Sequence, residues 1–276
     1  MTVYSYYDTE VRERLRDHVS LAIRSLESGS RLEKVGLSFF PTFRRAFEVS
    51  VLFHDFGKAF YNVVAFDDKK PLSFYGHEVI SAWAADRFLW ELRDLQPPEQ
   101  VIEPREIRII VLAVMLHHHA MGLESRMEHL QKSSFASESV DMRTWSAFFE
   151  EMNKRADENT LSAGSGLDLG SFMGEHFGID AGALEKLEKA CSAKRAALGE
   201  LIRESRELFR EYKNKIWDEP DSSSQRALLA VLQGLVAADY ISAGQGRKRN
   251  GGGAASDFER MIRQFEIMYM TRIKGQ

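Results

Sequence analysis

Apolar residues recur along this chain at helical spacing, and no convincing run of alternating strand positions is found. Asp8 can cap a first helix that runs to about Ser28. The apolar stripe of this helix advances in steps of three and four residues, through Val11, Leu15, His18, Ala22 and Leu26. The pattern therefore predicts an all-α protein in which His18 points inward.

Three further helices are predicted in the first half of the chain. One covers about 43–56 and ends at Gly57, a natural helix stop, and the next runs from about 75 to 94 with His77 in its first turn. A fourth begins at Pro104, and His118 lies on its apolar line. His117 lies on the neighbouring apolar line, so both histidines can face the same interior.

The second half is less regular. Residues 122–181 lose the helical pattern and are interpreted as a variable insertion within a single domain covering 1–276. Helices are expected again over about 183–215 and 224–242, and Asp239 shares the inward face of the second one with Leu228, Leu232 and Leu235. A flexible basic loop over 244–253 and a final amphipathic helix over about 256–272 complete the prediction.

Composition limits the possible environments. With 276 residues and 44% hydrophobic residues the chain can bury a real core, and its net charge of −4 argues against binding duplex nucleic acid by bulk electrostatics. The single cysteine, Cys191, excludes an internal disulfide and suits a reducing cytosol. The longest apolar run, 109–116, is too short to span a bilayer, so a cytoplasmic protein without a membrane segment is expected.

The candidate chemistry lies in histidines and aspartates at inward-facing helix positions. A lone histidine on an apolar face is more often a hydrogen-bonded core residue, but a buried carboxylate needs a positive partner, which a metal ion supplies. Imidazole and carboxylate without thiolate favour Mn, Fe, Co, Ni or catalytic Zn over structural zinc. Two ions bridged by Asp55 are expected, because the candidates outnumber the ligands of one open site: His18, His54, Asp55, His77, His117, His118 and Asp239.

These residues also carry a family resemblance. His18, His54-Asp55 and Asp239 match the H…HD…D signature of the HD superfamily. Together with Lys58 in HDFGK, His77 in GHE, the paired histidines and Asp239 in ADYIS, the chain resembles the HD nuclease of type I CRISPR interference, over about 10–120 and 224–243. It contains no GxxxxGK[ST] phosphate loop, so it is similar to the stand-alone form whose helicase is a separate polypeptide.

The resemblance implies an HD-domain helical bundle with the metal site at its centre. His18, His54, Asp55 and Asp239 would hold one divalent ion, and Asp55, His77, His117 and His118 the other, with a transition metal (Mn, Co, Ni or Fe) favoured over Mg. Asp55 and Lys58 are the implied catalytic residues. The implied activity is metal-dependent nuclease cleavage of single-stranded DNA in antiviral defence, with a separate helicase subunit and a crRNA-guided surveillance complex as partners. Whether the enzyme is an endonuclease or an exonuclease, and whether it also cleaves RNA, stays open from the sequence.

Several alternatives stay open from the sequence. His118-His119 fits the family's histidine pair as well as His117-His118, and the same ligands would serve an HD-type phosphohydrolase of nucleotides or cyclic nucleotides, an HD-type diiron oxygenase, or a scaffold that keeps its metal for stability. Glu78 and Ser242 are expected to orient ligands rather than bind metal. The basic run 247–249 is either a track for single-stranded DNA or a solvated loop.

Overall fold

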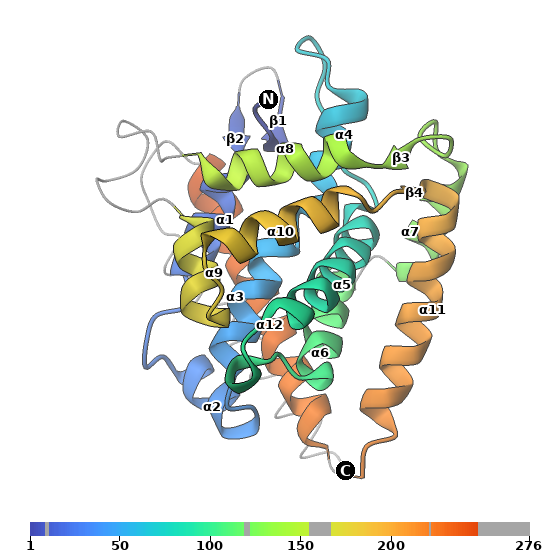
Figure 1. Ribbon diagram of the computed structural model, residues 1–276. Coiled ribbons are helices and arrows are strands. Elements are labelled where there is room, and N and C mark those ends of the chain that lie inside the picture. Colours follow the sequence, from blue (N-terminus) through green and yellow to red (C-terminus); the bar gives the residue numbers. More distant parts are fainter. Residues whose placement is uncertain (9–10, 119–121, 155–166, 221, 248–276) are drawn as a thin grey trace.

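The computed structural model describes residues 1–8, 11–118, 122–154, 167–220 and 222–247, the last three without their side chains. Most of this part of the chain is helical, which confirms the all-α class in its coarse form (Figure 1). Two short antiparallel strand pairs accompany the helices: β1 (Tyr4–Tyr7) with β2 (Arg12–Arg14), and β3 (Ser139–Val140) with β4 (Ala196–Ala197).

The helices of the first half, which carry most of the predicted site residues, are α1 (Leu15–Arg24), α2 (Arg31–Phe39), α3 (Phe43–Phe53), α4 (Phe56–Ala65), α5 (His77–Leu95), the short 3-10 turn η1 (Pro98–Gln100) and α6 (Pro104–Leu116). Those of the second half are α7 (Leu123–Lys132), α8 (Met142–Asn153), α9 (Leu169–Phe177), α10 (Ala181–Ser192), α11 (Leu198–Trp217) and α12 (Ser223–Arg247).

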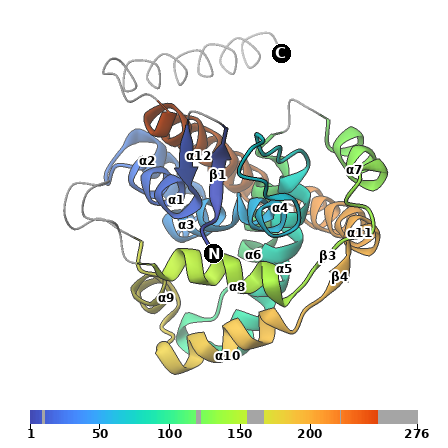
Figure 2. The same cartoon turned by 90° about the horizontal axis from the view of Figure 1, so that it is seen from above.

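The helix α12 contacts several helices of the first half of the chain. It packs against α1, α3 and α6, while α5 packs on α6 from the other side. The helices α8, α9 and α10 lie together on one side of this group, and α7 and α11 on another (Figure 2). Segments from both ends of the sequence, α1 and α12, are thus neighbours, which is the arrangement that a site built from residues 18 and 239 requires.

The N-terminal prediction was wrong in one respect. The strands β1 and β2 pair antiparallel to form the N-terminal hairpin, and the first helix begins at Leu15 rather than at Asp8. The Asp8 carboxylate accepts a hydrogen bond from the Val11 backbone N–H at 2.6 Å, so it caps the hairpin turn instead of a helix. Tyrosines at three of the four β1 positions have high strand propensity, which the helical reading overlooked.

A second correction concerns Gly57. The helix before it ends at Phe53, and Gly57 lies in the first turn of another helix, α4, which the sequence reading missed. A side chain Cβ at this position would lie 2.3 Å from the His77 carbonyl oxygen. The glycine is therefore required for the close approach of α4 and α5 and does not serve as a helix stop.

The second half also differs from the prediction. The region 122–181 contains α7, α8 and α9, and the expected helix over 183–215 is two helices, because β4 pairs with β3 between α10 and α11. The helix α12 continues to Arg247, so the first part of the expected basic loop is helical. The rest of that loop and the expected helix over 256–272 lie outside the described residues.

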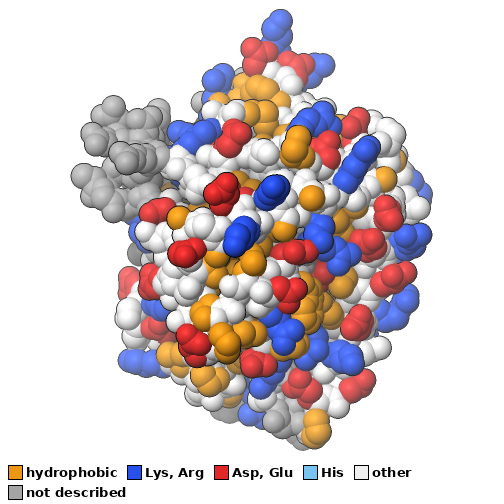
Figure 3. Space-filling model, in the orientation of Figure 1, with side chains coloured by type: hydrophobic (Ala, Val, Ile, Leu, Met, Phe, Trp, Pro, Cys, Tyr) orange, Lys and Arg blue, Asp and Glu red, His pale blue; other side chains and the backbone are white. Residues whose placement is uncertain are grey.

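One helix bears on the membrane expectation. Among the helices described, the stretch Ser223–Gly244 of α12 is long and apolar enough to cross a membrane by length and composition, with a mean hydropathy of 1.5. Half of the apolar window is buried inside the protein, and by length and composition alone a core helix would meet the same criterion. On the face drawn in Figure 3, Lys and Arg side chains are interspersed with Asp and Glu, which agrees with the charge balance of the sequence.

Candidate metal centre

Four of the predicted ligands converge at the contact of α1, α3 and α12. The Nε2 atom of His18 lies 3.3 Å from Nε2 of His54 and 3.1 Å from Oδ1 of Asp239. Oδ2 of Asp55 lies 3.4 Å from each of these two imidazole nitrogens. The three residues other than Asp239 are buried, and Asp239 keeps 22% of its side chain exposed. The structure thus brings together four donor atoms, one from each residue.

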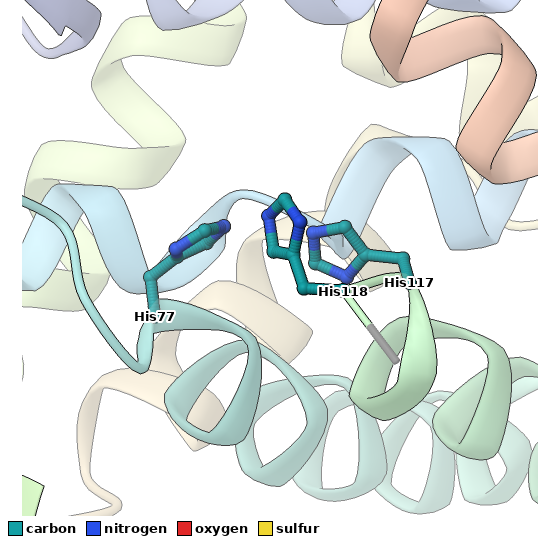
Figure 4. A group of neighbouring side chains, drawn as sticks. All are labelled: His77, His117 and His118. Carbon is teal, nitrogen blue, oxygen red and sulfur yellow. The ribbon is translucent and has the colours of Figure 1, made fainter. Parts of the chain in front are cut away.

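A second group stands beside the first. His77 begins α5, and His117 and His118 follow the end of α6, with their rings pointing toward the ring of His77 (Figure 4). Nε2 of His77 lies 3.0 Å from Oδ1 of Asp55. Asp55 therefore directs one carboxylate oxygen to each group of donors, in the position of a bridging ligand. His119, the alternative to one of the paired histidines, lies outside the described residues.

The turn that carries His54 and Asp55 is fixed by the aromatic residues on both sides of it. The rings of Phe53 and Phe56 are fully buried, and each stacks or tilts against Phe148 at centroid distances of 5.6 and 4.9 Å. Burial of one such side chain stabilises a fold by about 1.5–3 kcal/mol. These contacts hold the two polar residues in the interior, where they would otherwise be unfavourable.

Most of the histidines are oriented by the backbone. In His54, His77 and His117, the Nδ1 atom lies 2.7 Å from the backbone carbonyl oxygen of the residue three positions earlier. A carbonyl oxygen can only accept, so Nδ1 carries a proton, and in the neutral ring the lone pair lies on Nε2. This is the tautomer that a metal ion needs.

The pKa values of His117 and His118 agree with neutral imidazoles. Burial, together with the neighbouring His118, holds the pKa of His117 well below its ordinary value. Burial and the charge of His77 lower the pKa of His118 to about 4. Both rings are therefore neutral at pH 7 and can donate lone pairs to a cation.

The first group has the opposite electrostatics. Burial alone would lower the pKa of His18, but hydrogen bonds to Asp239 and Glu13 and the charge of Asp55 raise it to about 9. Burial would likewise raise the pKa of Asp55, but the charges of His54 and Lys58 outweigh it and hold that pKa well below its usual range. The carboxylates of Asp55 and Asp239 therefore stabilise positive charge in the interior, here on His18.

The donor set fits divalent cations. Both carboxylate oxygens of Asp55 and the Nε2 atoms of His77 and His117 are buried without a hydrogen bond of acceptable geometry, although charged neighbours lie close. Buried polar atoms normally have a hydrogen-bond partner, so these four atoms are suited to bind a ligand such as a metal ion. Atoms that bind one ion at about 2.1 Å lie about 3.0–3.4 Å apart, close to the 3.1–3.6 Å spacing of the first group.

Lys58 lies at the edge of the first group. Its Nζ atom is 2.7 Å from Oδ2 of Asp55 and 5.5 Å from the centre of the Phe74 ring, and 10% of its side chain is exposed. It is therefore not a solvated surface lysine. Lys58, on the first turn of α4, provides the positive charge nearest to Asp55 other than the histidines.

Ser242 and Glu78, which were expected to orient ligands, lie beside the histidines, and so does Glu13, which the sequence reading missed. The Ser242 hydroxyl lies 3.1 Å from Nδ1 of His18, and the Glu78 carboxylate behind His77 forms a buried ion pair with Arg126. Glu13 was missed, although its Oε1 lies 3.3 Å from Nδ1 of His18. In the predicted helix a residue five positions before His18 would face about 140° away, so only the hairpin brings Glu13 to it.

Two histidines lie apart from both groups. His129 is exposed on α7 with its ring 4.3 Å from that of Tyr75, and His176 on α9 pairs with Glu48 at 2.7 Å. The cluster itself reaches solvent at Asp239 and His118, which are only partly buried.

A comparison of the chain with protein-family models, with curated proteins and with solved structures finds no match.

Proposed function

We propose that this protein is a metal-dependent nuclease of the HD superfamily that hydrolyses phosphodiester bonds of single-stranded DNA. The observation that carries the proposal is the position of Asp55, which directs one carboxylate oxygen to each of two histidine-containing groups. Two donor groups that share a carboxylate are the arrangement used for phosphodiester hydrolysis with two ions. The order of the motifs along the chain agrees with that assignment.

Each group of residues has a part in this reaction. Two bound divalent ions supply the acidity that makes water a nucleophile at neutral pH and the positive charge that the phosphoryl oxygens need. Asp55 and Asp239 neutralise that charge in the ground state, and the neutral His117 and His118 add donor atoms without adding charge. Lys58, next to Asp55, is positioned to neutralise a phosphate oxygen as its charge develops.

The substrate follows from access to the cluster. The donors are buried except at Asp239 and His118, so a scissile phosphate has to enter the protein at that edge. Access at such an edge favours a flexible single strand over a rigid duplex as the substrate. The proposed partners are a separate helicase subunit, which would unwind the DNA, and a crRNA-guided surveillance complex, in the cytoplasm.

The direct test uses metal-stripped full-length protein and end-labelled single-stranded DNA. Mn²⁺, Co²⁺, Ni²⁺ and Mg²⁺ are added in separate reactions, and the variant Asp55→Asn is compared with wild type. Glu150→Gln serves as a surface control, because the Glu150 side chain is 60% exposed and lies on α8. Wild type and the control are expected to cleave in the presence of a transition metal, and Asp55→Asn is expected to be inactive.

Two kinds of result would contradict the proposal. Absence of metal-dependent cleavage, or equal cleavage by Asp55→Asn, would remove the nuclease assignment. Turnover of nucleotides or cyclic nucleotides with oligonucleotides left intact would favour a phosphohydrolase, and two bound irons with an oxidised product would favour an oxygenase.

A further inference from the structure

His18 is oriented differently from the other histidines of the cluster. Its Nδ1 atom faces side chains instead of a backbone carbonyl, with Oε1 of Glu13 at 3.3 Å and the Ser242 hydroxyl at 3.1 Å. The Nδ1 atoms that bond to a carbonyl oxygen three residues earlier are those of His54, His77 and His117. The direction of the His18 lone pair therefore depends on groups that mutation can remove.

Glu13 is itself held in place. Its side chain is buried, with 5% of the residue exposed, and its Oε2 atom accepts a hydrogen bond of 2.9 Å from the buried Ser5 hydroxyl. This bond occupies one carboxylate oxygen and leaves Oε1 for His18. Ser242 bonds to its own chain as well, because its hydroxyl donates to the Asp239 carbonyl at 2.9 Å. With that hydroxyl proton used, Ser242 offers His18 only an acceptor.

The hairpin that carries Glu13 is fastened to the helices. The Val3 N–H and the Arg14 guanidinium both donate to the buried Glu151 carboxylate on α8, at 3.3 and 3.1 Å. The Tyr4 N–H donates to the Asn62 side chain on α4 at 3.1 Å. The hairpin therefore presents Glu13 to His18 from a fixed position.

We propose that Glu13 is a positioning residue for His18. It accepts the Nδ1–H of His18, which fixes the ring with Nε2 directed at Nε2 of His54 and Oδ1 of Asp239 and makes Nε2 the atom that is free to bind a cation. The charge of Glu13 also increases the donor strength of the ring toward a bound ion. The N-terminal hairpin is by this account part of the metal site. The inference rests on the metal binding in the proposed function and does not depend on the reaction that follows.

The expected effect is confined to one of the two ions. Loss of a carboxylate that supports a histidine ligand typically weakens metal binding about 10–100-fold. The second group keeps its affinity, because His77 and His117 are oriented by carbonyl oxygens that substitution at position 13 does not change. A general loosening of the fold would weaken the binding of both ions.

The test is Co²⁺ binding by the full-length chain, followed by competition with a chromophoric chelator and by the visible spectrum of the bound Co²⁺. Glu13→Ala is expected to weaken one of two Co²⁺ ions about 10–100-fold and to change its spectrum. Glu13→Gln is expected to lie between Glu13→Ala and wild type, because an amide oxygen can still accept the Nδ1–H but carries no charge. Thermal unfolding of the metal-free variants is measured alongside.

Glu151→Gln is the matched control, because Glu151 is a buried carboxylate that holds the same hairpin without touching His18. The proposal predicts that the weakening and spectral change exceed those of Glu151→Gln at equal loss of thermal stability. Wild-type affinity in Glu13→Ala, or equal weakening of both ions in the two variants, would overturn it. If wild type itself bound no Co²⁺, the proposed function would fail with it, whereas Co²⁺ binding without DNA cleavage would contradict the nuclease alone.

Discussion

Replacement of Gly57 by alanine tests how α4 and α5 build the site. Alanine is favoured over glycine in a helix by about 0.5–1 kcal/mol, so the substitution would stabilise α4 if space allowed. The new Cβ, however, would lie 2.3 Å from the His77 carbonyl oxygen, and the two atoms must separate by about 0.7 Å to reach even 3.0 Å. The neighbour is backbone and cannot turn away. Forced shifts of this kind cost about 1–3 kcal/mol.

A matched control is present in the same chain. Gly199 occupies the same second position of α11 that Gly57 occupies of α4, and a Cβ there meets nothing within 4 Å. Gly199→Ala is therefore expected to raise the free energy of unfolding by about 0.5–1 kcal/mol. Gly57→Ala is expected to lie about 1–3 kcal/mol below that variant, the cost of the forced shift.

Urea unfolding of the metal-free variants measures this difference, and Co²⁺ titration measures its consequence for the site. Separation of α4 from α5 lengthens the 3.0 Å distance between Asp55 Oδ1 and His77 Nε2, so Gly57→Ala is expected to bind the second ion more weakly. Equal stability of the two alanine variants with unchanged Co²⁺ affinity would refute the steric argument.

Three further predictions follow from buried groups. The pKa of His18 is about 9 without metal, so Co²⁺ binding below that pH is expected to release about one proton from His18, and Co²⁺ affinity is expected to rise with pH up to about 9. Calorimetry in buffers of different ionisation enthalpy measures the proton release. A Co²⁺ affinity that does not depend on pH would contradict this prediction. Burial raises the pKa of Cys191, so its thiol should react with disulfide reagents only as the protein unfolds; rapid labelling of the native chain would be the opposite result. Arg126→Met removes the ion-pair partner of the buried Glu78 carboxylate and should lower the free energy of unfolding, measured in urea, by about 3–5 kcal/mol. Adding Glu78→Leu should recover most of this loss. A loss near zero in Arg126→Met would contradict the ion pair.

Much of the helical fold could be predicted from the sequence, and the predictions that were wrong have physical reasons. Helical phase correctly placed Leu15, His18 and Ala22 on a buried face, because those positions do belong to one helix. The same periodicity extended the predicted helix back to Asp8, because it does not reveal that β1 and β2 pair with each other and that tertiary contacts hold them. A short strand pair of this kind depends on partners that are distant in sequence.

The motifs supplied the candidate ligands, and the family resemblance divided them into two groups that share Asp55. The structure brings the same residues together in two neighbouring groups, but the distances between their donor atoms could not be read from the sequence. Gly57 was interpreted as a helix stop because glycine usually ends helices, whereas here the absence of a side chain permits contact with the His77 backbone. Glu13 belongs to no motif, and only the hairpin brings it to His18.

The central claim is that the two donor groups joined by Asp55 hold two divalent ions and use them to cut a phosphodiester bond. Its most direct test is to titrate metal-stripped protein with Mn²⁺ or Co²⁺ and to follow cleavage of labelled single-stranded DNA at each metal equivalent. The account predicts that cleavage rises to a plateau near two equivalents per chain and is lost in Asp55→Asn. Activity that saturates near one equivalent, or no cleavage at any metal level, would contradict it.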